Sequence, residues 1–185
     1  MEKSKVEFGH ALIFGGTGML TKATVWIAKH ANKTTVYGRN EIKLKKLEEQ
    51  YSEIGIQTRK LNYQETQNLR KEIQLAIEEN GPVRTVIAWI HSTAPDALST
   101  LEKEITKLQG EKWTFIIIKG SNSKLIKSDF PTSFEIKEIQ LGFIYDGTSS
   151  RWLTHEEISN GVIKGIVSKN KQTLIGTLTP WEKRP

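Results

Sequence analysis

The chain has 185 residues, 37% of them hydrophobic, which suits one domain with a substantial core. It contains no cysteine, and this excludes disulfides, thiolate metal sites and a cysteine nucleophile. The net charge of +6 comes from 27 basic and 21 acidic residues that are mixed along the chain without a nucleic-acid-binding motif, so we expect no nucleic-acid partner.

The amino-terminal residues give no sign of export or of a membrane anchor. Residues 1–5 include charges, but no long apolar segment follows them, because the first apolar run ends at Gly15. No apolar stretch of the chain is long enough to cross a bilayer. We therefore expect a cytoplasmic protein without a membrane partner.

The first pattern along the chain is a short strand, then a glycine-rich turn, then a helix. Residues 11–14 are apolar and run into three glycines, and apolar residues then recur at helical spacing as far as residue 31. Such a turn lets the backbone approach a dinucleotide pyrophosphate, and the helix directs its free N–H groups at the anion. The residues expected to contact a dinucleotide here are Gly15, Gly16, Thr17, Gly18, Met19 and Leu20.

The glycine spacing fits the dinucleotide pattern in part. Gly16 and Gly18 supply the first two glycines of Gly-x-Gly-x-x-Gly, whereas Thr21 stands at the last position. The alternative interpretation is an ordinary strand-to-helix turn. The elements that follow favour the dinucleotide site.

A second strand is expected at residues 34–37, and it ends in Gly38, Arg39 and Asn40. NAD sites carry an acid in this region to bind the ribose 2′-hydroxyl, whereas an arginine pairs with a 2′-phosphate. We therefore expect Arg39, with Asn40 beside it, to select NADP(H) over NAD(H). The alternative is a solvated arginine at the start of a helix.

A second helix is expected from Leu44 to residue 54, where Gly55 stops it, and a third strand at residues 56–61. The residues that follow this strand lie near the adenine in dinucleotide folds, and here they are Asn62 and Tyr63. Asn62 can hydrogen-bond the edge of the ring. Equally, Asn62 can cap the next helix, which is expected at residues 64–80.

A fourth strand at residues 84–90 is almost wholly apolar, as in a central parallel strand that is buried on both faces. Ligands of open α/β sheets lie beyond the carboxyl ends of the strands, so we expect Ile90 and His91 to border the cofactor. The alternative for His91 is a polar loop residue that caps the next helix. That helix is expected at residues 98–108.

The carboxyl-terminal part continues the alternation. A fifth apolar strand at residues 113–118 is followed by Lys119 and Ser121, which either reach a cofactor or substrate or are ordinary loop residues. A sixth strand is expected at residues 134–144 and a loop at 145–153. Thr154 and Glu157 form a capping box before a helix at 158–166, and a last strand spans 173–178.

Strands and helices thus alternate along the whole chain. The pattern predicts a doubly wound, mainly parallel α/β sheet with helices on both faces, the Rossmann fold, in one domain over residues 1–185.

In this arrangement the chain resembles the short-chain dehydrogenase/reductase family, in a compact, atypical, bacterial type. The resemblance covers nearly the whole chain, and the Gly-Gly-Thr-Gly sequence at 15–18 is more similar to the extended and NmrA-like branches than to the classical one. It implies NADP(H) bound with Arg39 at the adenine phosphate, and a homodimer. The segments that carry it are residues 15–20, 38–40, 62–63 and 151–158.

The sequence departs from this family at the catalytic motif Tyr-x-x-x-Lys. The residues four positions after its tyrosines (Tyr37, Tyr51, Tyr63 and Tyr145) are Glu41, Gly55, Gln67 and Ser149. The segment between the fifth and sixth strands is also too short for the long helix that carries the motif. A proton donor would therefore have to be His91, Lys119, Ser121 or Tyr145.

Other catalytic chemistry has no support in the sequence. The four histidines do not have metal-ligand spacing, so no metal is expected. Two hypotheses remain. The first is an NADP(H)-dependent oxidoreductase that acts on a small carbonyl substrate, and the second is a non-catalytic NADPH/NADP⁺ sensor that signals to a protein partner.

Overall fold

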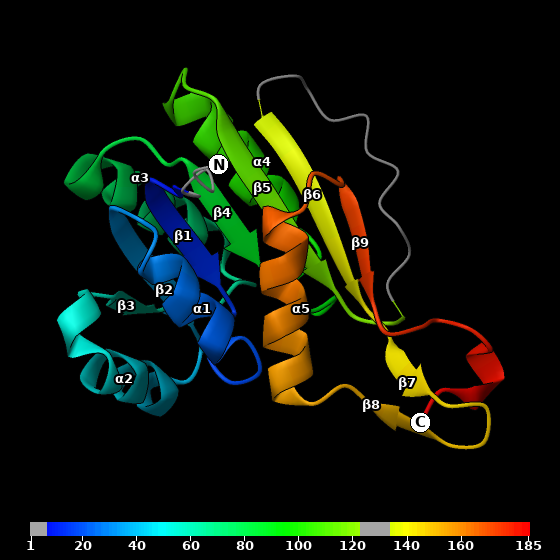
Figure 1. Ribbon diagram of the computed structural model, residues 1–185. Coiled ribbons are helices and arrows are strands. Elements are labelled where there is room, and N and C mark those ends of the chain that lie inside the picture. Colours follow the sequence, from blue (N-terminus) through cyan, green and yellow to red (C-terminus); the bar gives the residue numbers. More distant parts are fainter. Residues whose placement is uncertain (1–6, 123–133) are drawn as a thin grey trace, which may run out of the picture.

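The computed structural model describes residues 7–122 and 134–185 of the chain. Its centre is a seven-stranded parallel sheet with the order β3-β2-β1-β4-β5-β6-β9 (Figure 1). The strands are β1 (His10–Phe14), β2 (Lys33–Gly38), β3 (Gln57–Lys60), β4 (Thr85–Ala88), β5 (Trp113–Lys119), β6 (Phe134–Leu141) and β9 (Gln172–Ile175). The chain starts in the middle and extends the sheet first to one side and then to the other, which confirms the doubly wound fold class.

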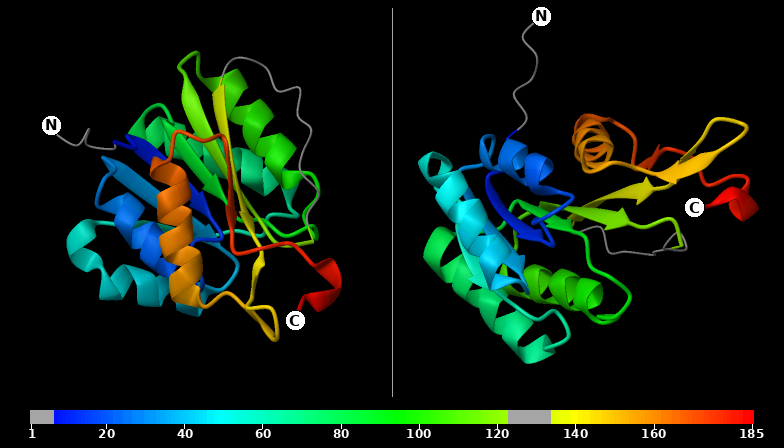
Figure 2. Two further views of the ribbon diagram at one scale, coloured as in Figure 1. Left: turned by 45° about the vertical axis from the view of Figure 1, so that its right-hand side comes forward. Right: turned by 90° about the horizontal axis from the view of Figure 1, so that it is seen from below.

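Helices cover both faces of the sheet (Figure 2). The first face carries α1 (Thr21–Ala28), α2 (Glu41–Gln50) and α5 (His155–Val167), and the second carries α3 (Thr66–Asn80) and α4 (Ala97–Leu108). None of the helices in the described part of the chain is both long and apolar enough to span a membrane.

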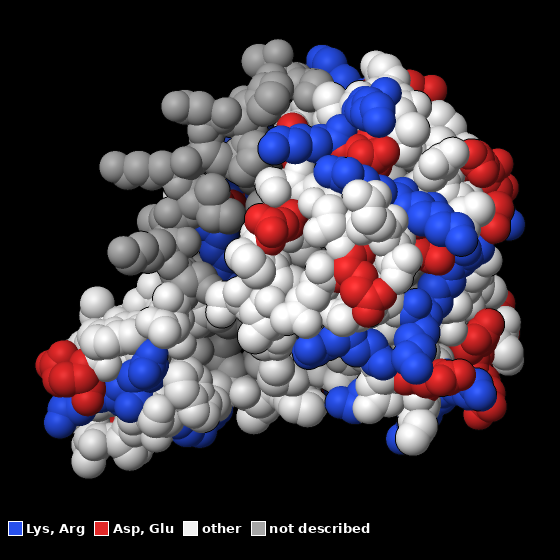
Figure 3. Space-filling model, turned by 180° about the vertical axis from the view of Figure 1, so that it is seen from behind, with Lys and Arg blue, Asp and Glu red and all other residues white. Residues whose placement is uncertain are grey.

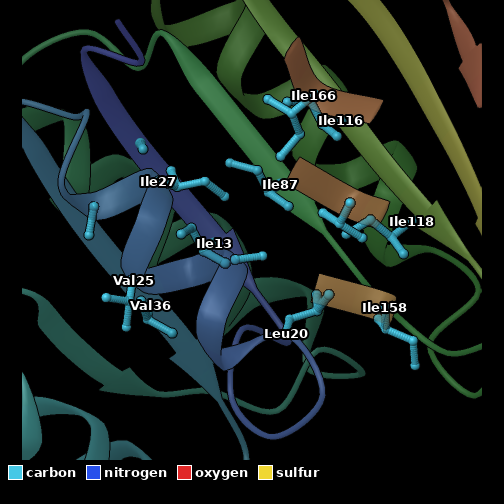
Figure 4. Packing of buried hydrophobic residues seen from close by; sticks show 14 of the residues in the cluster. Ile13, Leu20, Val25, Ile27, Val36, Ile87, Ile116, Ile118, Ile158 and Ile166 are labelled. Atoms are coloured by element: carbon cyan, nitrogen blue, oxygen red, sulfur yellow. The ribbon is translucent and has the colours of Figure 1, made fainter. Parts of the chain in front are cut away.

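The central strands are apolar throughout because both of their faces are buried. In β1, Ile13 faces the core under α1 and α5, whereas Leu12 and Phe14 face the core under α3 and α4. Figure 4 shows how Ile87 and Ile116 line up beside Ile13 in the first of these cores. Both cores include side chains of β1 and β4, and these strands carry the loops described below.

The predicted sixth strand is wrong beyond Leu141. β6 ends there, and a separate strand β7 (Phe143–Tyr145) pairs antiparallel with β8 (Ser150–Trp152), inside the segment predicted as a loop. The chain turns at Gly142, where a Cβ atom would collide with the Thr177 carbonyl. Phe143 and Thr177 exchange two backbone hydrogen bonds of 2.9 and 2.8 Å, which draw β7 out of the main sheet.

Other boundaries differ by a few residues. The fourth strand ends at Ala88 instead of residue 90, the first helix ends at Ala28 instead of residue 31, and the last strand ends at Ile175, before Gly176 with its φ of +78°. The second helix ends at Gln50 and is followed by a 3₁₀ turn, Ser52–Ile54. The segments 1–6 and 123–133, which include the predicted short connection before the sixth strand, lie outside the described residues.

Candidate dinucleotide site

The strand order reverses between β1 and β4, and ligands of such sheets bind beyond the carboxyl ends of the strands at this point. Three adjoining hollows lie there, with volumes of about 20, 220 and 410 Å³. His91 lines all three, and Trp89 lines the two larger ones. The three hollows therefore adjoin one another around His91, and we call this row of hollows, from Arg39 at one end to Lys119 at the other, the crevice.

Two glycines give the loop after β1 its shape. Gly15 has a φ of +79°, and a Cβ atom there would collide with the backbone carbonyl of Trp89. Gly18 has a φ of +82° and open space beside it, with the Lys43 ammonium 3.9 Å from where a Cβ would lie. A ligand can approach the backbone at Gly18 because no side chain intervenes.

The neighbouring residues of the loop serve mainly to fix it. A Cβ on Gly16 would lie 2.7 Å from both Ile13 and Thr24, so this glycine allows α1 to pack on the sheet. Leu20 is 1% exposed and belongs to the core. Among the predicted contact residues, Gly15, Thr17 and Met19 line the middle hollow, whereas Gly16 and Leu20 face the interior.

Hydrogen bonds from other elements fix the same loop. Thr21, at the position where the motif has glycine, bonds the Gly18 carbonyl through its N–H at 3.1 Å and its hydroxyl at 2.8 Å. Ser159 of α5 donates its hydroxyl to the Met19 carbonyl at 2.9 Å. Sequence reasoning missed Ser159, because nothing in its local pattern links it to a loop so distant in the chain.

Tyr63 joins the glycine loop to the end of β2. Its hydroxyl accepts the Gly15 N–H at 2.8 Å and donates to the Tyr37 carbonyl at 2.7 Å. Burial raises the pKa of Tyr63 to about 12, so the phenol stays protonated at neutral pH. Tyr63 also lines the two smaller hollows, so this candidate residue both supports the glycine loop and borders the crevice.

Two cations face the middle hollow, namely Arg39, a candidate from the sequence, and Lys43, which sequence reasoning missed. Within residues 7–122 and 134–185, neither has a carboxylate within 4 Å, whereas the nearby Glu41 pairs with Lys45 and Lys60. Asn40 accepts the Lys43 N–H at 3.0 Å and caps α2. The capping residue Asn40 could have identified Lys43 from the sequence, because an N-cap at residue 40 places residue 43 in the first turn of α2, next to the glycine loop.

Asn62 does not cap the next helix, so this alternative interpretation is wrong: α3 follows Glu65, and no side chain caps it. Asn62 instead stabilises the turn that precedes the helix. Its side chain accepts the Gln64 N–H at 3.2 Å and donates to Glu65 at 3.1 Å. Together with Ile90 and His91 it lines the smallest hollow, which has room for about one water molecule.

The crevice brings together three of the four proton-donor candidates. His91, Lys119 and Ser121 line the largest hollow, in which the Lys119 ammonium lies 2.7 Å from the Glu138 carboxylate. Tyr145 lies elsewhere, on β7, and donates to the Gly147 carbonyl at 2.9 Å. No group of three metal-ligating side chains occurs among the described residues.

No protein-family model and no curated protein sequence matches this chain. Solved structures with the same fold exist. A short-chain type dehydrogenase/reductase from Mycobacterium marinum superposes with a TM-score of 0.70 at 12% identity, over 93% of this chain and 95% of its own. A short chain dehydrogenase from Mycobacterium smegmatis gives 0.68 at 7%, over 94% and 93%.

A citronellol catabolism dehydrogenase from Pseudomonas aeruginosa gives a TM-score of 0.68 at 12% identity, over 95% of this chain and 96% of its own. At such low identities these matches define the architecture alone. The chain has the Rossmann-type fold of short-chain dehydrogenases/reductases, as its sequence predicts.

Proposed function

We propose that the chain binds NADP(H) in the crevice beyond β1 and β4. The observation that carries this proposal is the pair of cations, Arg39 and Lys43, which lack a carboxylate partner in the described structure and face a glycine loop of the required shape. Cations held beside such a loop suit a ligand with several phosphate groups. The fold of the similar structures is consistent with a nicotinamide dinucleotide.

The residues present fit the cofactor in three places. The open backbone at Gly18 and the start of α1 suit the pyrophosphate. Arg39 suits the 2′-phosphate, to which its planar guanidinium can donate two hydrogen bonds. Lys43 lies between these two places and supplies a second positive charge.

The same arrangement supports a reductase of small carbonyl compounds. When bound, the nicotinamide supplies a hydride, and this end of the cofactor would reach the largest hollow. His91, Ser121 and Lys119 line this hollow and are the groups available to hold the carbonyl oxygen and to donate a proton.

A second candidate function is a non-catalytic NADPH/NADP⁺ sensor that signals to a protein partner. The observation that favours it is the lack of a Tyr-x-x-x-Lys sequence anywhere in the 185 residues. Tyr145, the last tyrosine in the sequence, lies on β7 and does not line the largest hollow. Cofactor binding without turnover of any carbonyl compound would favour the sensor over the reductase.

The other expectations remain proposals, namely a homodimer in the cytoplasm without a nucleic-acid or membrane partner. Acidic side chains interrupt the basic ones on the face formed by α3 and α4 (Figure 3). Arg70 of α3 and Glu104 of α4 form an ion pair that contributes to this mixture. A surface of mixed charge is unlike the continuous basic patch of a nucleic-acid-binding protein.

The decisive experiment is calorimetric titration of the protein with NADPH and, separately, with NADH. We expect micromolar NADPH binding and much weaker NADH binding. Arg39→Ala should lower the affinity for NADPH about tenfold to a hundredfold, which is the effect of a lost charge-assisted hydrogen bond. It should lower the affinity for NADH far less. Lys46→Ala on the exposed side of α2 is the control and should change neither affinity. Equal losses for both cofactors would contradict the 2′-phosphate role of Arg39.

A further inference from the structure

A buried ion pair borders the largest hollow of the crevice. The Lys119 ammonium, at the end of β5, lies 2.7 Å from a carboxylate oxygen of Glu138 on β6, and both side chains are only 5–6% exposed. The other Glu138 oxygen accepts a hydrogen bond of 3.2 Å from Gln172 on β9. Three adjacent parallel strands therefore hold Lys119 in one position at the wall of the hollow.

Stability alone does not explain such a pair. Two charges removed from water lose their hydration, and apolar residues of the same volume usually stabilise a fold as well or better. An ammonium has three N–H donors, and within residues 7–122 and 134–185 Glu138 accepts one of them and no other acceptor is found. The remaining donors can bind a ligand in the hollow that Lys119 lines.

The pair also sets the charge of this hollow. Lys119 is the charged member among the described lining residues, and Glu138 neutralises it from behind. The walls are largely apolar, with Trp89, Ile90 and Leu98 among them, and the volume is about 410 Å³. Such a site offers a strong hydrogen-bond donor without a net positive charge.

We infer that the hollow takes a neutral, mainly apolar carbonyl compound, whose oxygen accepts a hydrogen bond from Lys119. Glu138 is a positioning residue that also excludes carboxylates, because a second anion at Lys119 would repel the first in a site of low dielectric. This inference rests on the proposed function, since it defines the substrate class of the same crevice.

Acetophenone and benzoate test the inference, because they share a ring and a nearly identical shape and differ in charge. Their binding to the protein without cofactor is measured by ligand-observed saturation-transfer NMR titration. We expect wild-type protein to bind acetophenone more tightly than benzoate. In Glu138→Gln the amide keeps the shape of the carboxylate and leaves Lys119 unneutralised, so the affinity ratio should shift toward benzoate by about tenfold or more.

A second variant, Lys119→Met with Glu138→Gln, removes both charges and tests the donor. We expect acetophenone to bind it about tenfold more weakly than wild type, with benzoate remaining weak. Lys103→Met on the exposed side of α4 is the control for loss of a positive charge, and it should behave as wild type. Thermal unfolding of each variant shows whether it is folded.

An unchanged affinity ratio in folded Glu138→Gln, or unchanged acetophenone binding in the folded double variant, would overturn the inference. NADPH titration of the same samples distinguishes a failure of this substrate-class inference from a failure of the proposed cofactor binding. NADPH binding without acetophenone binding refutes the substrate class alone. Acetophenone binding without NADPH binding refutes the cofactor proposal and leaves the assignment of this hollow intact.

Discussion

Gly15 meets two requirements that no other residue type meets at once. Its φ is +79°, and its backbone lies against the Trp89 carbonyl at the end of β4. Gly55 is the control, because its φ is +72° but a Cβ there would meet nothing within 4 Å. We expect Gly15→Ala to lower the free energy of unfolding by about 1–3 kcal/mol more than Gly55→Ala does, because only at Gly15 does the added Cβ collide with backbone. Urea titrations of the two variants measure this difference, and equal losses would contradict the role of the Trp89 contact.

Tyr63 gives the glycine loop a dependence on alkaline pH. Burial raises its pKa to about 12 from 10, so its protonated form contributes stability that is complete below pH 10 and is lost as pH rises through 12. Tyr63→Phe lacks both hydrogen bonds and should be about 1–2 kcal/mol less stable at pH 7. Urea unfolding of wild type and Tyr63→Phe should show a smaller difference in the free energy of unfolding at pH 11.5 than at pH 7. A difference that does not change with pH would contradict this assignment.

The candidate residues that the sequence singles out are those whose position depends on local spacing. Gly15 and Arg39 follow directly after β1 and β2, and Gly18 lies three residues beyond Gly15, so short-range spacing was sufficient to select them. Lys43 and Ser159 were missed because their positions depend on how α2 and α5 pack against the loop. Side-chain contacts between distant segments leave no mark in the pattern of a single chain.

The junction between β8 and α5 depends on one carboxylate. Glu157 completes the predicted capping box with Thr154 and also accepts two hydrogen bonds of 2.9 Å from Arg151. The Arg151 guanidinium, followed by the Thr154 N–H, lowers the pKa of Glu157 to about 2. Its stabilising effect is therefore present above pH 4.5 and is lost as pH falls through 2.

We accordingly expect Glu157→Gln to have a lower Tm than wild type at pH 7, because the amide keeps the cap but loses the ion pair. The two proteins should converge near pH 2, where the wild-type carboxyl is half protonated. Glu156→Gln, one position earlier in the same turn, is the control and should show a smaller change. A difference in Tm that persists at pH 2 would mean that charge is not the cause.

At the scale of elements, the sequence predicts the type of most helices and strands and fails where two segments meet. Alternating apolar residues continue past Leu141, so periodicity alone extends the sixth strand to residue 144. The strand ends because Gly142 lies against Thr177. A glycine inside a strand pattern is a signal for such a close approach, but it does not identify the partner.

At the scale of the molecule, the fold class follows from alternation, because short parallel crossovers with helices on both faces have few solutions. The strand order places the switch point between β1 and β4, and with it one crevice from Arg39 to Lys119. The β7–β8 hairpin was not predictable, since its three-residue strands are too short to show a period. The main sheet and the position of the crevice could therefore be predicted from the sequence, whereas the hairpin could not.

A ligand that occupies the whole crevice should stabilise the protein more than a ligand that occupies one end. At a hundred times its dissociation constant, a ligand adds about 2.7 kcal/mol to the free energy of unfolding, or about 5–10 °C in Tm for a domain of this size. At equal concentration we expect NADPH to raise Tm most, adenosine 2′,5′-bisphosphate less and AMP least. The bisphosphate presents a 2′-phosphate to Arg39 and Lys43, which AMP lacks, but leaves the end at Lys119 empty. Equal shifts with AMP and the bisphosphate would contradict the 2′-phosphate site, and equal shifts with the bisphosphate and NADPH would mean that the largest hollow takes no part in cofactor binding.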